Sequence, residues 1–133
     1  MVDPNRWTSV ALRVFSPIIP VSEITTLMGP ATDTKEKGQA YSKLSKNLRT
    51  ESVWILESPD EVEDCVRTRL AWIVSYAESR RERLRKIQES CQVDVVLGFA
   101  SEKGQACVVL PDELLGRLGH LRLALVLDLY PPT

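Results

Sequence analysis

Five stretches of the chain alternate between apolar and polar or small side chains, which is the period of a β-strand. The clearest case is the last stretch, in which every second residue from 121 to 129 is a leucine. A serine, glutamate, lysine and glycine at residues 101–104 are typical of a hairpin turn between two of these stretches. The predicted strands are residues 9–16, 52–58, 92–100, 105–110 and 121–130.

Three other segments repeat apolar residues at steps of three and four, which is the period of an α-helix. The predicted helices are residues 21–29, 59–89 and 111–119. The second is the most strongly indicated, because Ser58, Pro59 and Glu61 form a capping box with proline at the first helical position. A straight helix over this range would be about 46 Å long. We therefore expect its C-terminal part to overhang the sheet or to bend.

The order of these elements predicts an α+β fold. We expect a two-layer sandwich in which a mostly antiparallel five-stranded sheet carries helices on one face. The whole chain has the order β-α-β-α-β-β-α-β, and from residue 52 onward this is the ferredoxin-like order. The strand at 9–16 is expected at an edge of the sheet, and the strand at 121–130 is expected inside it, with its leucines in the core.

Length and composition fit one domain. The chain has 133 residues, 44% of them apolar, and domains cluster at roughly 100–150 residues. We expect a single domain over 1–133, with tails at 1–8 and 131–133. Residues 30–51 carry five Lys or Arg against three Asp or Glu and show no clear period. Because loops of this length are usually functional or mobile, we expect a long basic loop there.

Charge and titratable residues argue against several kinds of site. The 17 Lys and Arg nearly balance the 18 Asp and Glu, whereas nucleic-acid binders usually carry a basic surplus. Cys65, Cys91 and Cys107 are dispersed and His120 is the only histidine, so we expect reduced thiols, no metal site and no cofactor. No signal peptide or membrane-length apolar run is visible, which predicts a cytoplasmic protein without a membrane partner.

No arrangement of nucleophile, acid and base predicts catalysis, and we expect no catalytic residue. Residues 35–38 (KEKG) lack the glycine spacing of a phosphate-binding loop. His120 follows a glycine where a helix is expected to end, so it is placed to satisfy terminal carbonyls. The basic run at 78–86 contains compensating glutamates. An enzyme needs convergent titratable side chains, and the sequence indicates no such pair.

Several segments in a fixed order are similar to those of a known family. They are the opening LRVFS, then VSEITTLMG followed by Pro30, Thr32 and the Lys37-Gly38 pair, then VWILESP with the helix behind it, and the ending LPDELLGRLGHLRLALVLDLY. Over about residues 9–130 the chain resembles the bacterial family catalogued as domain of unknown function 4279. The resemblance implies a single α+β domain. It implies no activity, and no catalytic residue can be carried over from it.

The residues that alternate with the expected core form a second apolar face. A two-layer fold leaves this face open, and exposed apolar patches of more than a few hundred Å² usually mark an interface or a ligand groove. In the alternative, the N-terminal segment or the loop 30–51 covers the face. The expected members are Ala11, Phe15, Leu56, Val96, Val109, Ala124 and Val126, with Trp54 and Tyr130 as further candidates and with Arg13, Asp94, Arg122 and Asp128 among them.

Two function classes remain open from the sequence. The first is a small, non-catalytic bacterial protein-interaction module, for example an accessory or immunity-type protein. It would act through the open sheet face or through an edge strand at 9–16 or 92–100, most simply as a homodimer. The second is a small-molecule-binding domain or enzyme with a pocket between the sheet and loop 30–51. The candidate interaction or pocket residues are Arg13, Phe15, Lys37, Trp54, Val96, Val109 and Val126.

Overall fold

A five-stranded sheet with β1 (Trp7–Ser16) at its centre organises the protein in a computed structural model, which describes residues 7–100 and 108–130. The other strands are β2 (Asp33–Lys35), β3 (Ser52–Glu57), β4 (Gln92–Ala100) and β5 (Ala124–Tyr130). The order across the sheet is β2-β3-β1-β4-β5. Neighbouring strands are antiparallel except for the parallel pair β4 and β5.

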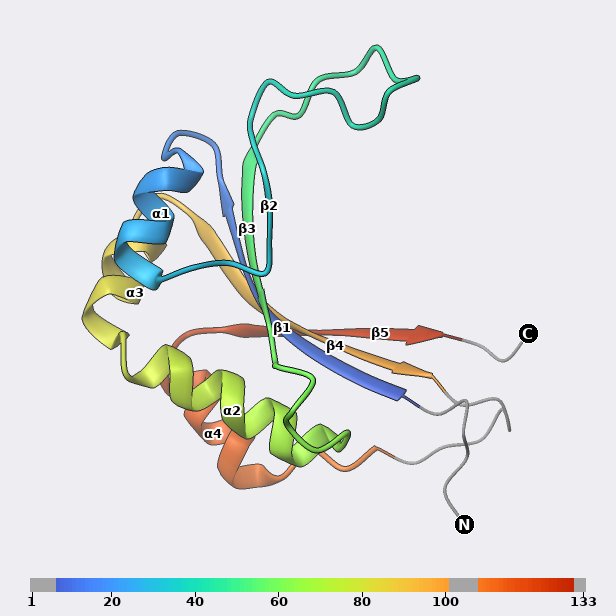
Figure 1. Cartoon of the computed structure of the whole chain (residues 1–133). Helices are drawn as coiled ribbons and strands as arrows, with labels where there is room; N and C mark the ends of the chain where they lie inside the picture. Colours follow the sequence, from blue (N-terminus) through green and yellow to red (C-terminus); the bar gives the residue numbers. More distant parts are fainter. Residues whose placement is uncertain (1–6, 101–107, 131–133) are drawn as a thin grey trace.

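The helices form a second layer on one face of this sheet (Figure 1). They are α1 (Val21–Met28), α2 (Val66–Glu78), α3 (Arg81–Gln88) and α4 (Asp112–His120). The core lies between the two layers, because alternate residues of the strands face the apolar side of each helix. Its completely buried members include Val10, Leu12, Val14, Ile24, Met28, Trp54, Leu70, Ile73, Val95, Leu97 and Ile87.

This architecture confirms the predicted α+β class, with a mostly antiparallel five-stranded sheet and helices on one face. The ferredoxin-like order is not confirmed, because the observed order along the chain is β1-α1-β2-β3-α2-α3-β4-α4-β5. β4 and β5 are parallel neighbours joined through α4, and parallel neighbours need such a crossover.

Two expected strand positions are wrong. β1 is the central strand instead of an edge strand, because it pairs with β3 on one side and with β4 on the other. β5 is an edge strand instead of an internal one, because β4 is its only neighbour in the described sheet. Burial follows these positions: Leu12 of β1 is completely buried, whereas Leu127 and Leu129 of β5 are exposed.

The strand expected at 105–110 is not formed in its described part. Residues 108–110 are irregular, while the turn at 101–104 and residues 105–107, including Cys107, lie outside the described residues. The fifth strand is β2 instead, which lies within the expected loop 30–51. Its three residues are Asp, Thr and Lys, so no apolar alternation marks them in the sequence.

The helix expected at 59–89 starts later than predicted, at Val66, so the capping box at Ser58 is wrong. Ser58 stays with the sheet, because its backbone N–H donates to the Val10 carbonyl at 2.9 Å. Its hydroxyl accepts a hydrogen bond from Arg69 Nη1 at 3.0 Å. The acidic stretch after Ser58 therefore crosses from the sheet to the helical layer as irregular chain, and does not fill the first helical turns.

The same predicted helix is divided into α2 and α3. Arg80 lies between them with φ −120° and ψ 27°, outside the helical region. Ser79 donates its hydroxyl to the Tyr76 carbonyl at 2.8 Å. The break confirms the expectation that the long helix bends, and it allows α3 to pack against α1 (Figure 1).

Three elements meet where α1 ends, at Gly29. Gly29 has a φ of +96°, a left-handed conformation that glycine adopts without a Cβ clash. Its carbonyl accepts a hydrogen bond from the Trp54 indole N–H at 3.1 Å. The Tyr76 hydroxyl donates to the adjacent Met28 carbonyl at 2.5 Å. The end of α1 is thus tied to β3 and to α2.

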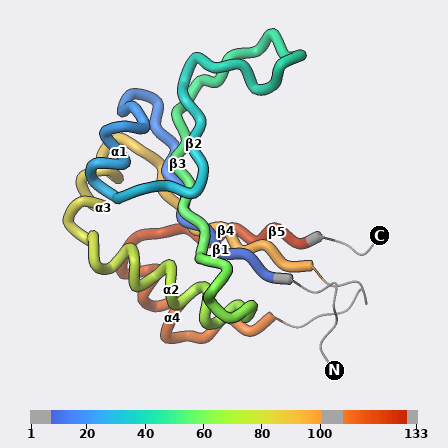
Figure 2. The backbone as a smooth tube through the Cα atoms, in the orientation of Figure 1, coloured from blue at the N-terminus to red at the C-terminus, as the bar shows by residue number. Residues whose placement is uncertain are grey.

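Residues 36–51 continue the β2–β3 pair as a two-stranded projection, which we call the arm. The pairing of Ala40 with Leu48 keeps the register that places Lys35 opposite Val53. Figure 2 shows the arm leaving the sheet and bending away from the helices. The expected loop 30–51 is therefore a short strand followed by an ordered ribbon, and the ribbon does not cover the sheet.

Candidate interaction surface

The face of the sheet opposite the helices, which we call the open face, carries apolar side chains from β1, β3, β4 and β5. The strand register places them together, because Ala11 pairs with Val96 and Val96 pairs with Val126. No helix of the described residues lies on this face (Figure 1). Its apolar members are Ala11, Phe15, Val53, Ile55, Val96, Ala124 and Val126.

An ion pair lies among these apolar side chains. Arg13 donates from Nε to Asp94 Oδ1 and from Nη2 to Asp94 Oδ2, both at 2.8 Å. The two side chains are 26% and 11% exposed, and the guanidinium also lies over the Phe15 ring, 5.0 Å from its centroid. A bidentate pair of this kind fixes both side chains. The two charges balance each other, so a partner that covers this ion pair buries no unpaired charge there.

Four of the seven candidate residues share the open face: Arg13, Phe15, Val96 and Val126. Their exposure differs, because neighbouring side chains shield the middle of the sheet. Phe15 and Val96 are half-buried, and Val126 on the edge strand is 37% exposed. A partner that covers this face would therefore bury the most additional surface near β5.

Trp54 and Leu56 are not on the open face, so the predicted orientation of β3 is wrong. Both side chains point into the core, and Trp54 is completely buried. Val53 and Ile55 occupy the open face instead, opposite Phe15 and Arg13. All four β3 residues are apolar, so the alternation defines two faces without indicating which one meets the helices.

Lys37, Val109 and Arg122 lie outside the four strands that form the open face. Lys37 is at the base of the arm, where its Nζ donates to the Pro17 carbonyl at 2.9 Å. Val109 is 70% exposed in the irregular segment before α4. Arg122 precedes β5 and has a φ of +57°. The structure therefore does not gather Lys37, Trp54 and Arg13 around one pocket.

The arm carries a set of exposed apolar side chains that the sequence analysis did not single out. Tyr41, Leu44 and Leu48 are 52%, 97% and 59% exposed. The backbone N–H of Arg49 donates to the Gln39 carbonyl at 2.7 Å, and the Arg49 guanidinium lies 4.7 Å from the Tyr41 ring centroid. In the sequence, the only indication of this set is the presence of apolar residues within a basic stretch.

The chain leaves the other end of β3 through residues 57–64, which we call the acidic segment. It contains five carboxylates and no Lys or Arg. Asp64 is held by the Thr8 backbone N–H at 2.9 Å and by the Thr8 hydroxyl at 2.6 Å, and Arg69 Nε lies 3.7 Å from it. The remaining carboxylates, Glu57, Asp60, Glu61 and Glu63, are exposed.

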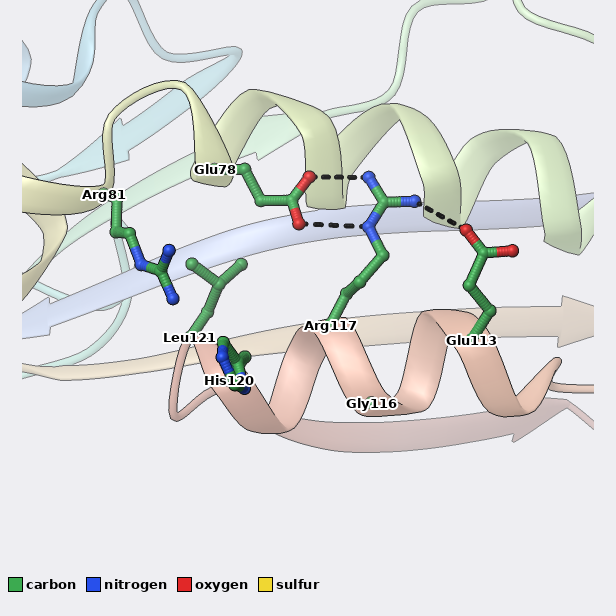
Figure 3. A pocket seen from close by; sticks show the side chains of 7 residues that line it. All are labelled: Glu78, Arg81, Glu113, Gly116, Arg117, His120 and Leu121. Atoms are coloured by element: carbon green, nitrogen blue, oxygen red, sulfur yellow. Dashed lines mark hydrogen bonds and ion pairs between the residues drawn. The ribbon is translucent and has the colours of Figure 1, made fainter.

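A pocket of 260 Å³ lies between α2, the start of α3 and α4 (Figure 3). Arg117 of α4 crosses it to Glu78, with Nη2 and Oε1 2.6 Å apart, and also pairs with Glu113 at 3.5 Å. Hydrogen bonds from Arg117 hold the pKa of the Glu78 carboxyl below its ordinary value. Arg81 and His120 lie at the other end of the pocket. The ion pair between Arg117 of α4 and Glu78 of α2 therefore joins these two helices.

A second, more open pocket of 720 Å³ lies beside the end of α3 and the start of β4. It is a shallow surface, and it lies away from the arm. Its lining residues are Arg85, Gln88, Glu89, Cys91, Gln92, Val93 and Arg122.

Cys65 and Cys91 are free thiols. Backbone N–H groups at the start of α2, first that of Thr68, lower the pKa of the Cys65 thiol. Within residues 7–100 and 108–130, no three His, Cys, Asp or Glu side chains are grouped closely enough to hold a metal ion. No helix in these same ranges is long and apolar enough to cross a membrane.

Comparisons with known proteins give a family for this chain. The model of the family described as "Domain of unknown function (DUF4279)" matches residues 5–132, which is nearly the whole chain. A search of curated proteins and a search of solved structures each give no match.

Proposed function

The chain belongs to the DUF4279 family, and from its surface we propose that it is a non-catalytic protein-interaction module that acts through the open face. A second copy of the chain is the simplest partner, because closed two-fold dimers are the commonest way to cover such a patch. An accessory or immunity-type protein would use a surface of this kind.

One observation carries this proposal: the open face is apolar around an internally neutralised ion pair. Its seven apolar side chains come from four strands, and Arg13 and Asp94 are already paired at 2.8 Å. Stable association needs about 800 Å² from each partner. The open face extends across four adjacent strands that lie about 4.8 Å apart, so it is about 14 Å wide between its outer strands, and a stable dimer would also bury the side chains around it.

A dimer cannot form by edge-to-edge pairing of strand 9–16 or 92–100, because neither strand is at an edge of the sheet. Both backbone edges of β1 are occupied, and β4 is paired with β1 and with β5. The strands with a free edge in the described sheet are β2 and β5. β2 has three residues, so an edge-to-edge variant of the dimer would use β5.

Sedimentation of the wild type and of two glutamate variants tests the proposal. We expect a wild-type mass near twice 15.0 kDa at micromolar concentration and a monomer for Val126→Glu, because a charge would be buried in the interface. Leu115→Glu is the matched control: Leu115 is 43% exposed on α4, in the helical layer, so this variant should remain a dimer. A monomeric wild type, or a Val126→Glu variant that still dimerises, would contradict the proposal.

Small-molecule binding is the second candidate, in the pocket between α2, α3 and α4 instead of the one expected between the sheet and loop 30–51. It is supported by the 260 Å³ pocket that holds Arg81, Arg117 and His120. A thermal-shift screen of the wild type against a metabolite library tests it, since a ligand that binds the native state raises the melting temperature. A monomeric wild type with a reproducible shift from one ligand class would favour this second function.

A further inference from the structure

The arm has few contacts with the rest of its own chain that would stabilise it. Its two strands are joined by backbone hydrogen bonds such as Gly38 N–H to the Arg49 carbonyl at 2.9 Å, but they lie beyond the sheet (Figure 2). A two-stranded ribbon on its own is marginally stable. Leu44 is 97% exposed and Leu48 is 59% exposed. A surface that covers these side chains would stabilise the arm.

The charges of the arm and of the acidic segment are opposite. Residues 39–50 of the arm contain Lys43, Lys46 and Arg49 and no Asp or Glu. The acidic segment, residues 57–64, contains five carboxylates and no Lys or Arg. β3 connects the two, and its six residues span about 20 Å. Each copy therefore has a basic end and an acidic end, separated by the length of one strand.

A two-fold axis that packs two open faces together can lie in two directions. If the axis runs along the strands, β3 of one copy is parallel to β3 of the other and the two arms lie at the same end, with like charges together. If the axis runs across the strands, the two β3 strands are antiparallel. The arm of each copy then lies at the acidic end of the other copy. Like charges in an interface cost several kcal/mol, so the charge pattern favours the second arrangement.

The direction of the arm agrees with this arrangement. In Figures 1 and 2 the arm bends away from α1 and towards the side of the open face. The acidic segment leaves β3 at its other end and runs to the start of α2 (Figure 1). An arm that reaches past the open face of one copy is therefore directed towards the sheet of a second copy, at the end where the acidic segment leaves its β3.

We propose that two copies pack open face to open face with antiparallel β3 strands, and that the arm of each copy binds the acidic segment of the other. This inference rests on the proposed function and specifies its geometry. Lys43 and Lys46 pair with carboxylates of the acidic segment, such as Asp60 and Glu61. The apolar side chains of the arm pack against the second copy, which removes their exposure.

Charge reversal in matched pairs tests the proposal. One variant carries Lys43→Glu and Lys46→Glu, and the other carries Asp60→Lys and Glu61→Lys; all four residues are exposed. Each variant alone should dimerise at least about tenfold more weakly than the wild type, because each places like charges together. An equimolar mixture should form a heterodimer of wild-type affinity, since one arm contact is then the wild-type contact and the other is restored with the signs exchanged.

Controls separate failure of the arm contact from failure of the proposed function. A variant with Arg83→Glu and Arg85→Glu makes the same change of charge on α3, in the helical layer, and should dimerise like the wild type. A wild-type dimer that is insensitive to the arm and acidic-segment reversals would overturn the arm contact while the proposed function stands. The same holds for a mixture that does not recover affinity. A monomeric wild type would overturn both, and circular dichroism of each variant shows that it is folded.

Discussion

Gly29 fixes the end of α1 through its own backbone conformation, and we expect Gly29→Ala to destabilise the protein. At Gly29, the φ of +96° with a ψ of 179° is a backbone conformation almost restricted to glycine, which costs a residue with a Cβ about 1–3 kcal/mol. The added Cβ would also lie 2.5 Å from the Tyr76 hydroxyl oxygen, which disturbs its hydrogen bond to the Met28 carbonyl. Urea denaturation should therefore show a loss of at least this size in the free energy of unfolding.

Gly116→Ala is the matched control for that substitution. Gly116 lies within α4, and a Cβ there meets nothing within 4 Å. Alanine should stabilise this helical position by about 0.5–1 kcal/mol. Two substitutions of the same kind are thus expected to have opposite signs. A loss at Gly116 as large as that at Gly29 would contradict the assigned role of Gly29.

Glu78 is expected to make stability depend on pH in acid. The Arg117 hydrogen bond lowers the pKa of Glu78 in the folded state from its ordinary value of 4.5. Its contribution is therefore present above pH 4.5 and is lost as the pH falls through the lowered folded pKa. The pair is partly exposed (30% and 39%), so Glu78→Gln should cost less than about 1 kcal/mol at pH 7.

Urea denaturation of Glu78→Gln and the wild type at pH 7 and at pH 3 measures this effect. The difference between the two proteins should shrink towards pH 3, because below pH 4.5 the unfolded wild type binds a proton at this carboxyl. An Arg117→Met variant should show the same trend, because it removes the other partner. A difference that is equal at both pH values would mean that the pair does not carry the effect.

At the residue scale, sequence alternation located the apolar positions of β3 but not their side. Trp54 and Leu56 were placed on the open face and lie in the core, while Val53 and Ile55 were assigned to the core and lie on the open face. A two-residue period separates the two faces of a strand but does not indicate which face the helices cover. For β1 and β4 the predicted core-facing side is confirmed, since large apolar side chains such as Leu12 and Leu97 are buried against the helices.

At the scale of elements, the position of a strand in the sheet should decide what a leucine contributes. Leu12 in central β1 is completely buried, whereas Leu125 in edge strand β5 is half-buried. We expect Leu12→Ala to cost about 2–5 kcal/mol and Leu125→Ala clearly less, in urea denaturation of both variants. An internal position of this strand, as expected from the sequence, would instead give a loss of about 2–5 kcal/mol at Leu125 as well. Equal losses would place β5 inside the sheet after all.

The elements themselves were largely predictable, and their boundaries and neighbours were not. The strands at 9–16, 52–58, 92–100 and 121–130 and the helices at 21–29 and 111–119 all correspond to observed elements. The start of α2 was missed because Ser58 resembles an N-cap, although its hydrogen bonds keep it with the sheet and with Arg69. Strand neighbours depend on contacts between distant residues, which local periodicity does not contain.

At the scale of the whole molecule, the sequence predicted an open apolar face but not the arm. The second set of alternating residues indicated the face, and Arg13, Phe15, Val96 and Val126 lie on it. The arm escaped prediction because its ribbon follows the register of β2, a strand of three polar residues. The basic charge of residues 30–51 is visible in the sequence, but the projection of these residues beyond the sheet follows only from the fold.

Dimerisation through the open face also predicts a concentration-dependent melting temperature. A dimer that unfolds to monomers is stabilised by mass action as the protein concentration rises. The wild-type melting temperature should therefore increase between micromolar and hundredfold higher concentration in differential scanning calorimetry. That of Val126→Glu should stay constant. A wild type with a constant melting temperature would contradict the proposed dimer independently of its measured mass.

The central place of β1 has a consequence for how the chain acquires its fold during synthesis. β1 is made before both of its neighbours, and Arg13 meets Asp94 across 81 residues of sequence. During translation, β1 therefore emerges with neither backbone edge paired; β3 can pair with one edge, and the other edge can be paired only after β4 has left the ribosome. Long-range pairing of this kind slows folding. In the nascent chain, the central strand of the sheet is therefore exposed for longest, and a chaperone that binds extended apolar segments would meet it first.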